Sequence, residues 1–135
     1  DLKERARELT EGRGVNVVID PVGDRWAEPA LRSLGWQGRY CVVGFAGGAI
    51  PSLPINLVLL NERRILGVEN KNWSQRNPQE HDTILSILAN WASRGLIRPR
   101  ISARYSLEDS VEALKFAQTR QVLGKIVIEV DTNIK

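Results

Sequence analysis

The sequence has few of the residues that build metal, disulfide or nucleophile sites. Its single cysteine, Cys41, excludes a disulfide within the chain and a metal cluster built from thiols. Cys41 stands in the apolar run YCVV, where a buried, unreactive thiol is expected, and this usage fits a reducing, cytoplasmic compartment. The single histidine, His81, has no helically spaced partner, so we expect it on the surface. No HExxH motif, Ser-His-Asp set or paired zinc-ligand spacing is present.

The chain also lacks the signals of a membrane or nucleic-acid protein. No run of about 18 apolar residues occurs, so no membrane span is predicted, and residues 1–5 do not resemble a signal peptide. The net charge is +3, but the basic residues are scattered rather than gathered in a stripe with aromatic residues. We therefore expect neither a membrane nor a nucleic acid as a partner. The first residue is Asp1 rather than methionine, which suggests processing or excision from a longer chain.

Length and composition are those of a globular domain. The chain has 135 residues, of which 42% are hydrophobic and 26% charged. It is long enough to bury a core and counts as one domain by length.

The most informative segment is residues 15–48. It reads as a strand (VNVVID), a tight turn (PVGD), a helix (RWAEPALRSLG) and a second strand leading into a glycine-rich loop (GRYCVVGFAGG). Such a βαβ unit builds nucleotide-binding sheets, yet the G-x-G-x-x-G fingerprint that cradles a pyrophosphate is absent from the sequence. The chain thus carries the pattern of half a cofactor site.

Periodicity and turn residues predict the other elements. A helix ends at Gly12, the segment 55–61 is a short helix or a strand, and 71–77 is a polar loop. Further helices are predicted at 24–34, from Pro78 to Gly95 and at 106–121. Strands are predicted at 15–19, 40–43, 64–68, 101–105 and 124–128. The fold class is α/β, a doubly wound and mainly parallel sheet whose early strands we expect to be covered on both faces.

In open parallel sheets, ligands bind at the carboxyl ends of the strands. Gly44, Gly47 and Gly48 follow the second strand, and they either admit a flat ring or ribose close to the backbone or only turn the chain. Asp20 ends the first strand, and local turn or cap bonding is the favoured role over ligand binding. These residues contain no self-sufficient catalytic set.

Four sequence strings, ELTEGRGVNVVIDPVG, ALRSLGWQGRYCVVGFAGGAIPSLPINLVLLNERRILGV, ISARYSLEDSVEAL and VLGKIVIEV, closely resemble the C-terminal half of zinc-independent medium-chain dehydrogenase/reductases. The nearest branch is the NADPH:quinone oxidoreductase group. The resemblance covers essentially the whole chain. It implies that residues 1–97 are the C-terminal half of a Rossmann domain and that 98–135 return toward a GroES-like catalytic domain.

The resemblance also implies a cofactor site and a function. The cofactor-binding residues would be Val22, Gly23, Gly44, Phe45, Ala46, Val68, Glu69, Asn70 and Lys125. The cofactor would be NADPH, with NADH as the alternative, and no zinc or other metal is expected. The parent enzyme would reduce a quinone or an activated alkene, such as an enone, by hydride transfer. The chain would be a fragment that is inactive alone, because the pyrophosphate loop is missing.

Two other functions remain open. The parent could be an enoyl reductase or an alcohol dehydrogenase of the same superfamily. The chain could instead be a non-catalytic interaction or oligomerisation module, since an unpaired edge strand readily pairs with a second copy. In either case we expect a homodimer through the edge strand from Ile65 to Val68.

Overall fold

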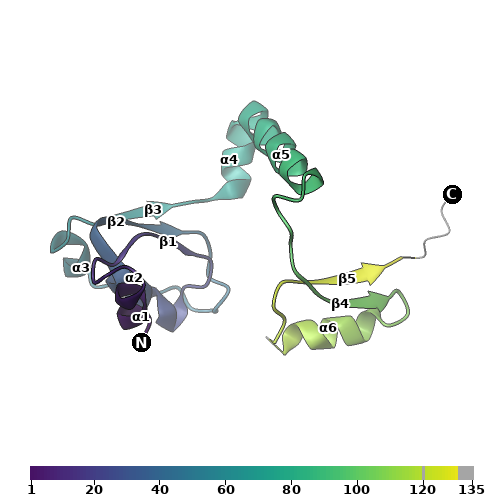
Figure 1. Ribbon diagram of the computed structural model, residues 1–135, viewed down its shortest axis with the longest axis horizontal. Helices are drawn as coiled ribbons and strands as arrows, with labels where there is room; N and C mark the ends of the chain where they lie inside the picture. Colours follow the sequence, from purple (N-terminus) through teal and green to yellow (C-terminus); the bar gives the residue numbers. More distant parts are fainter. Residues whose placement is uncertain (120, 131–135) are drawn as a thin grey trace. The chain divides into compact units, whose positions relative to one another are not determined.

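The computed structural model describes residues 1–119 and 121–130 (Figure 1). The chain forms two compact units, Asp1–Arg76 and Asn77–Lys135. This division falls before the domain boundary predicted after Ile97. That boundary concerns which parent domain each segment belongs to, and it stays a prediction.

A three-stranded parallel sheet is the centre of the first unit. Its strands are β1 (Val15–Asp20), β2 (Leu34–Val42) and β3 (Arg64–Gly67), in the order β1-β2-β3. The predicted α/β class with parallel strands is therefore confirmed. The second strand begins at Leu34 rather than at residue 40. Residues 35–38 form a bulge in it, because Val15 pairs with Leu34 and Val17 with Arg39, and Gln37 has a φ of 54°.

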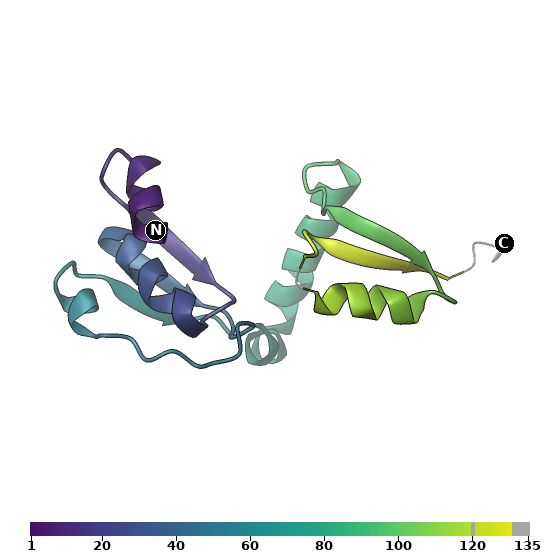
Figure 2. The same ribbon diagram turned by 90° about the horizontal axis from the view of Figure 1, so that it is seen from below.

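Four helical segments of the first unit gather on one face of this sheet. They are α1 (Leu2–Glu8), the 3-10 turn η1 (Asp24–Trp26), α2 (Ala27–Ser33) and α3 (Asn56–Leu59). The segment with two possible predictions, 55–61, is thus helical. Figures 1 and 2 show α1 and α2 side by side on the same side of the sheet, and these two helices pack against each other.

The core of the first unit lies between α2 and the sheet. Leu31 and Tyr40 are its largest fully buried side chains. They cluster with Ala27, Ala30, Leu34 and Leu57, and Val15, Val18, Val42, Leu53 and Val58 pack around them. Because adjacent strand residues point to opposite faces, this core uses one face of the sheet only.

The opposite face of the sheet is bare within the first unit. Ile19, Cys41 and Leu66 pair across the three strands on that face, and Ile19 is 71% and Leu66 42% exposed. The prediction that both faces of these strands are covered is therefore wrong for the described unit. A continuous β-branched run such as VNVVI shows that both faces are apolar, but not what covers them.

Two glycines let the turn after α1 cross the start of β2. Gly14 has a φ of 80°, and a Cβ there would lie 2.7 Å from the Gly35 amide nitrogen. A Cβ on Gly35 would in turn collide with the carbonyl oxygen of Arg13. The backbones approach too closely at this crossing for any side chain.

The segment predicted as a polar loop is a helix, α4 (Asn70–Arg76). Both carboxylate oxygens of Glu69 accept from amides of its first turn, at 2.9 Å from Lys71 N and 2.6 Å from Asn72 N. This cap satisfies amides that have no partner within the helix. The α4 sequence, NKNWSQR, has no apolar stripe that would predict a helix, and none of its residues is buried.

The second unit contains a long helix and a small βαβ unit. The helix α5 (Pro78–Ser93) starts at the predicted proline and is followed by Gly95 with a φ of 68°. The βαβ unit consists of β4 (Ile101–Ser106), α6 (Ser110–Gln118) and β5 (Lys125–Glu129), and its two strands are parallel. The predicted α6 was longer at both ends.

Side chains in the second unit are mostly exposed. Over its described residues only Ala113 is buried, and the apolar stripe of α5, which includes Ile84, Leu88 and Trp91, is open to solvent. Among the residues that the structure describes, none of the helices is both long enough and apolar enough to cross a membrane.

Candidate cofactor-binding edge

The loops that follow β1 and β2 are joined to each other by backbone hydrogen bonds. The amides of Val43 and Gly44 both donate to the carbonyl of Asp20, at 2.9 and 3.3 Å. Further bonds join Ala46 N to Pro21 O (3.0 Å), Gly47 N to Val22 O (2.8 Å) and Asp24 N to Ala49 O (3.1 Å). The carboxyl ends of the two strands thus form one hydrogen-bonded edge, here called the joined loops (residues 20–24 and 43–49).

The side chain of Asp20 holds the first of these loops. One carboxylate oxygen accepts from the amides of Val22 at 2.8 Å and Gly23 at 2.9 Å, and the other accepts from the Tyr40 hydroxyl. This bears out the expectation of local turn bonding for Asp20. Tyr40 was not singled out in the sequence, although a tyrosine in a buried strand usually needs a partner for its hydroxyl.

Burial and hydrogen bonding act in opposite directions on Asp20. Burial alone would raise the pKa of its carboxyl, but the bonds from the Tyr40 hydroxyl and from the Gly23 and Val22 amides outweigh it, and the pKa is lowered. For Tyr40, burial and the neighbouring Asp20 carboxylate both raise the pKa. Near neutral pH the pair is therefore a carboxylate that accepts from a neutral phenol, and it positions the loop rather than transferring a proton.

Glycines allow the joined loops to approach each other. Gly23 has a φ of 65°, and a Cβ there would lie 2.8 Å from the Phe45 ring. A Cβ on Gly47 would lie 2.7 Å from the Cβ of Asp24. Gly44 differs, because a Cβ there would meet only Pro21, whose carbonyl oxygen would lie at 3.4 Å, the limit of ordinary contact. Gly23 and Gly47 are thus needed by the fold, whereas Gly44 is not.

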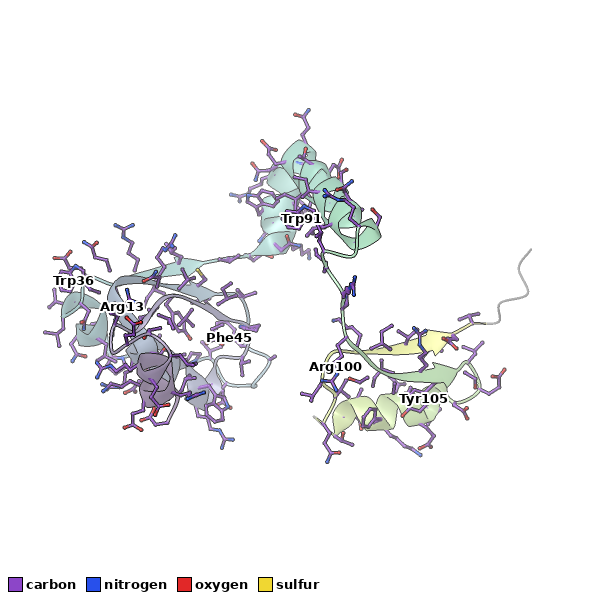
Figure 3. All side chains as sticks on the ribbon, viewed as in Figure 1. Arg13, Trp36, Phe45, Trp91, Arg100 and Tyr105 are labelled. Atoms are coloured by element: carbon purple, nitrogen blue, oxygen red, sulfur yellow. The ribbon has the colours of Figure 1, made fainter. Side chains whose placement is uncertain are left out.

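The hydrogen bonding of the joined loops determines which ligand group they suit. The amides of Val22, Gly23, Gly44, Ala46 and Gly47 donate to groups of the chain itself, so they do not form the cradle of free amides that binds a phosphate. Their exposed side chains are apolar, at Val22, Val43 and Phe45. Figure 3 shows Phe45 and Trp36 at opposite ends of the sheet, with Phe45 at the carboxyl end. Such a surface suits a flat ring rather than an anion.

The third strand end continues this edge. The Val68 amide donates to the Val42 carbonyl at 2.9 Å, so Val68 adjoins the end of β2. Glu69 caps α4 and Asn70 is the first residue of that helix. Of the predicted site residues, Val22, Gly23, Gly44, Phe45 and Ala46 come together in the joined loops. The set Val68, Glu69 and Asn70 lies at the neighbouring strand end.

The remaining candidate lies elsewhere in the chain. Lys125 is in the second unit, where it opens β5 and its amide donates to Arg100 O at 2.8 Å. Over residues 1–119 and 121–130, no three His, Cys, Asp or Glu side chains come together as a metal site. The assignment of these residues to a cofactor stays a prediction.

Sequence reasoning missed a buried arginine beneath this sheet. Arg63 is 8% exposed, and its guanidinium donates to the carbonyls of Leu34, Leu57 (3.2 Å) and Gly35 (3.5 Å). Burial, with smaller contributions from Arg7 and Arg32, lowers its pKa. The side chain ties the end of α2 to α3. Arg63 is the first of two adjacent arginines before β3, and nothing in this local sequence indicates its burial.

Comparison with known proteins identifies this arrangement. The family model described as zinc-binding dehydrogenase matches residues 1–128. The chain belongs to the zinc-binding dehydrogenase family. The name describes the family and assigns no zinc to this chain.

Named relatives of the family are oxidoreductases. "Quinone oxidoreductase-like protein 2" of Bos taurus is 39% identical over 127 residues, which cover 94% of this chain and 36% of that protein. The "2-haloacrylate reductase" of Burkholderia sp is 28% identical over 136 residues, covering 95% of this chain and 39% of that one. A mycobacterial structure solved as a complex with NADPH is 25% identical, with a TM-score of 0.75. It matches 94% of this chain and 39% of its own.

These comparisons confirm the predicted resemblance to quinone oxidoreductases and the parallel α/β fold. The chain spans little more than a third of the length of the relatives it matches. Activity, substrates and partners of a whole protein are therefore matters for proposal.

Proposed function

We propose that this chain supplies the nicotinamide-binding edge of an NADPH-dependent oxidoreductase that reduces quinones or activated alkenes. The observation that carries the proposal is the joined loops, in which internal hydrogen bonding leaves an apolar, glycine-lined strand edge in place of a phosphate cradle. The family supports it through relatives named for quinone and haloacrylate reduction and a related structure with NADPH.

NADPH, when bound, supplies the hydride. The chain's own residues would position it. Val22 and Phe45 offer apolar surface to a flat ring, and Gly44 leaves the backbone open to close approach. Asp20 and Tyr40 hold the loop that carries Val22. The structure supports a role of this edge in orientation, and the buried Asp20–Tyr40 pair is not a proton donor near neutral pH.

We also propose that the chain alone is inactive. The amides of the joined loops named above donate to groups of the chain itself, so they are not available to a pyrophosphate. We expect no NADPH binding at micromolar concentration in a fluorescence titration of the chain. A chimera that adds the preceding part of the Bos taurus relative before Asp1 should bind NADPH. It should oxidise NADPH with a soluble benzoquinone or enone, followed by near-ultraviolet absorbance. Micromolar binding by the chain alone would contradict the half-site; a chimera that binds NADPH but reduces neither acceptor would contradict the reaction.

Two glycine variants test the joined loops in that chimera. Gly44→Ala should leave the melting temperature nearly unchanged, because its Cβ has room, yet weaken NADPH binding by about tenfold or more. Gly47→Ala should destabilise the fold, because its Cβ would overlap Asp24. If Gly44→Ala binds NADPH as well as the parent chimera, the nicotinamide does not lie against this residue.

We also propose that β3 pairs with β3 of a second copy. All four of its residues are exposed, and Val68 N bonds to β2, so by alternation the backbone groups of Ile65 and Gly67 face the free edge. Two such edges would pair across a twofold axis. Sedimentation velocity should show a dimer that Ile65→Pro dissociates, because proline cannot donate at this edge. A monomer at high concentration would remove this proposal.

A further inference from the structure

Tyr40 links the buried core of the first unit to the joined loops. It is 1% exposed and packs in the core cluster that contains Leu31. Val18 is its partner in β1, and Asp20 lies two residues further on, so Tyr40 and Asp20 are on the same face of the sheet. Because a buried hydroxyl needs a hydrogen-bond partner, the Tyr40 side chain extends toward the end of β1 and donates to Asp20.

Asp20 extends this constraint to the first of the joined loops. Its other carboxylate oxygen accepts from the amides of Val22 at 2.8 Å and Gly23 at 2.9 Å. One side chain therefore holds the Tyr40 hydroxyl and two backbone groups. Asp20 is 8% exposed, so water has little access to replace a missing donor. A carboxylate oxygen that lost the Tyr40 hydroxyl would recruit another donor, and the amides of this loop are the donors already bound to the same side chain.

Phe45 is the residue of the second loop that such a shift would reach. Gly23 has a φ of 65°, and a Cβ added there would lie 2.8 Å from the Phe45 ring, so the ring rests directly against the Gly23 backbone. The ring is also 41% exposed, at the carboxyl end of the sheet (Figure 3). Because closely packed groups transmit small displacements, a movement of Gly23 would displace this exposed aromatic surface.

We propose that Tyr40 is a positioning residue, which sets the place of the Phe45 ring through Asp20 and Gly23 and thereby orients the nicotinamide for hydride transfer. Tyr40 is too deeply buried to touch the cofactor itself. This inference rests on the function proposed above, and it adds that a residue of the hydrophobic core controls the geometry of that site. Since the joined loops offer apolar contact rather than a phosphate cradle, a misplaced ring should affect the transfer step more than the affinity for NADPH.

The first measurement needs no cofactor. In nuclear magnetic resonance spectra of the chain, Overhauser contacts should join the Phe45 ring to the α protons of Gly23, and Tyr40→Phe should weaken or remove them. The matched control is Leu34→Ala, which truncates a buried core residue at the start of β2, the end of that strand remote from the joined loops. This control should lower the melting temperature at least as much and leave the ring contacts intact.

The second measurement uses the chimera described above. At saturating NADPH, Tyr40→Phe should slow hydride transfer to a soluble benzoquinone by about tenfold in a single turnover, with the Kd for NADPH changed by less than about threefold. Leu34→Ala should leave both values unchanged, because a loss of stability does not alter the rate of the molecules that remain folded. Asp20→Asn should retain more of the rate than Asp20→Ala, since its side-chain oxygen can still accept from the loop amides.

Three results would overturn the proposal. Unchanged ring contacts in Tyr40→Phe would mean that the constraint ends at Asp20. Equal effects of Tyr40→Phe and Leu34→Ala would mean that Tyr40 acts through stability alone. Displaced ring contacts with an unchanged rate of hydride transfer would mean that the ring does not orient the nicotinamide. A parent chimera that does not bind NADPH would instead contradict the proposed function, and the ring contacts, measured without cofactor, would still decide whether Tyr40 places Phe45.

Discussion

Both units contain parallel strands joined by a helix, but they bury side chains to very different extents. The first unit encloses Leu31, Leu34, Tyr40 and Leu57 between helix and sheet, whereas over the described part of the second unit only Ala113 is buried. The difference lies in the number of packed elements. Three strands with packed helices exclude water from a core, and a two-stranded sheet beneath one helix does not. Shared topology therefore does not imply shared stability.

The largest expected contrast comes from truncating one leucine in each unit. Leu31 is fully buried, and Leu31→Ala should reduce the free energy of unfolding by about 2–5 kcal/mol. Leu114 on α6 is 63% exposed, and Leu114→Ala should cost less than about 0.5 kcal/mol. Urea denaturation of both variants measures the two effects. Equal losses would mean that the second unit packs as tightly as the first.

Buried polar groups sharpen the same contrast, since the first unit alone has them among the described residues. Arg63→Met should destabilise by about 1–3 kcal/mol, because the carbonyls of Leu34 and Leu57 lose their donor while buried. The neighbouring Arg64→Met, exposed on β3, should stay within about 0.5 kcal/mol. Thermal unfolding of the pair tests this, and a neutral Arg63→Met would show that the cost of burying the charge cancels its hydrogen bonds.

The Asp20–Tyr40 pair predicts how stability depends on pH. The folded pKa of Asp20 is lowered, so its contribution is present above the unfolded value of about 3.9 and is lost as pH falls through the folded pKa. The folded pKa of Tyr40 is raised, so its contribution is present below about 10 and is lost at more alkaline pH. Tyr40→Phe should cost about 1–2 kcal/mol near neutrality and flatten both limbs of the stability–pH curve. If Tyr40→Phe leaves the acid and alkaline limbs of the stability–pH curve unchanged, the Asp20–Tyr40 pair is not their cause.

The smallest effect is expected at an ion pair of the second unit. Arg104 and Glu129 approach to 2.6 Å across β4 and β5, but both side chains are more than half exposed. Glu129→Gln should change the free energy of unfolding by less than about 0.5 kcal/mol, and added salt should reduce even that. Exposed ion pairs usually contribute at most about 1 kcal/mol. A larger loss would show that this ion pair compensates for the missing core of the second unit.

Local sequence patterns correctly predicted the elements that are bounded by glycine or proline. The strand at Val15–Asp20 lies between Gly14 and Pro21, and α5 begins at Pro78, as expected. The start of β2 was missed because Leu34 pairs with Val15 ahead of a bulge at residues 35–38. The helix α4 was missed because it depends on the Glu69 cap. Neither cause is visible in composition or periodicity.

The candidate site was predictable to a similar degree. Strand-end position alone brought Val22, Gly23, Gly44, Phe45 and Ala46 together, because the carboxyl ends of parallel strands share one edge. The Tyr40 bond to Asp20 and the burial of Arg63 were not predictable, since each depends on residues that are distant in sequence. The bare face of the sheet was missed for the related reason that apolar residues indicate burial without naming the partner.

The bonds between the joined loops also have a consequence for conformational entropy. Loops that are free in solution must be ordered when a ligand binds, and that ordering subtracts from affinity. Here Gly44, Ala46 and Gly47 are already tied to the preceding strand end by their amides. A ligand that meets this edge finds it in place, so more of the contact energy remains for affinity.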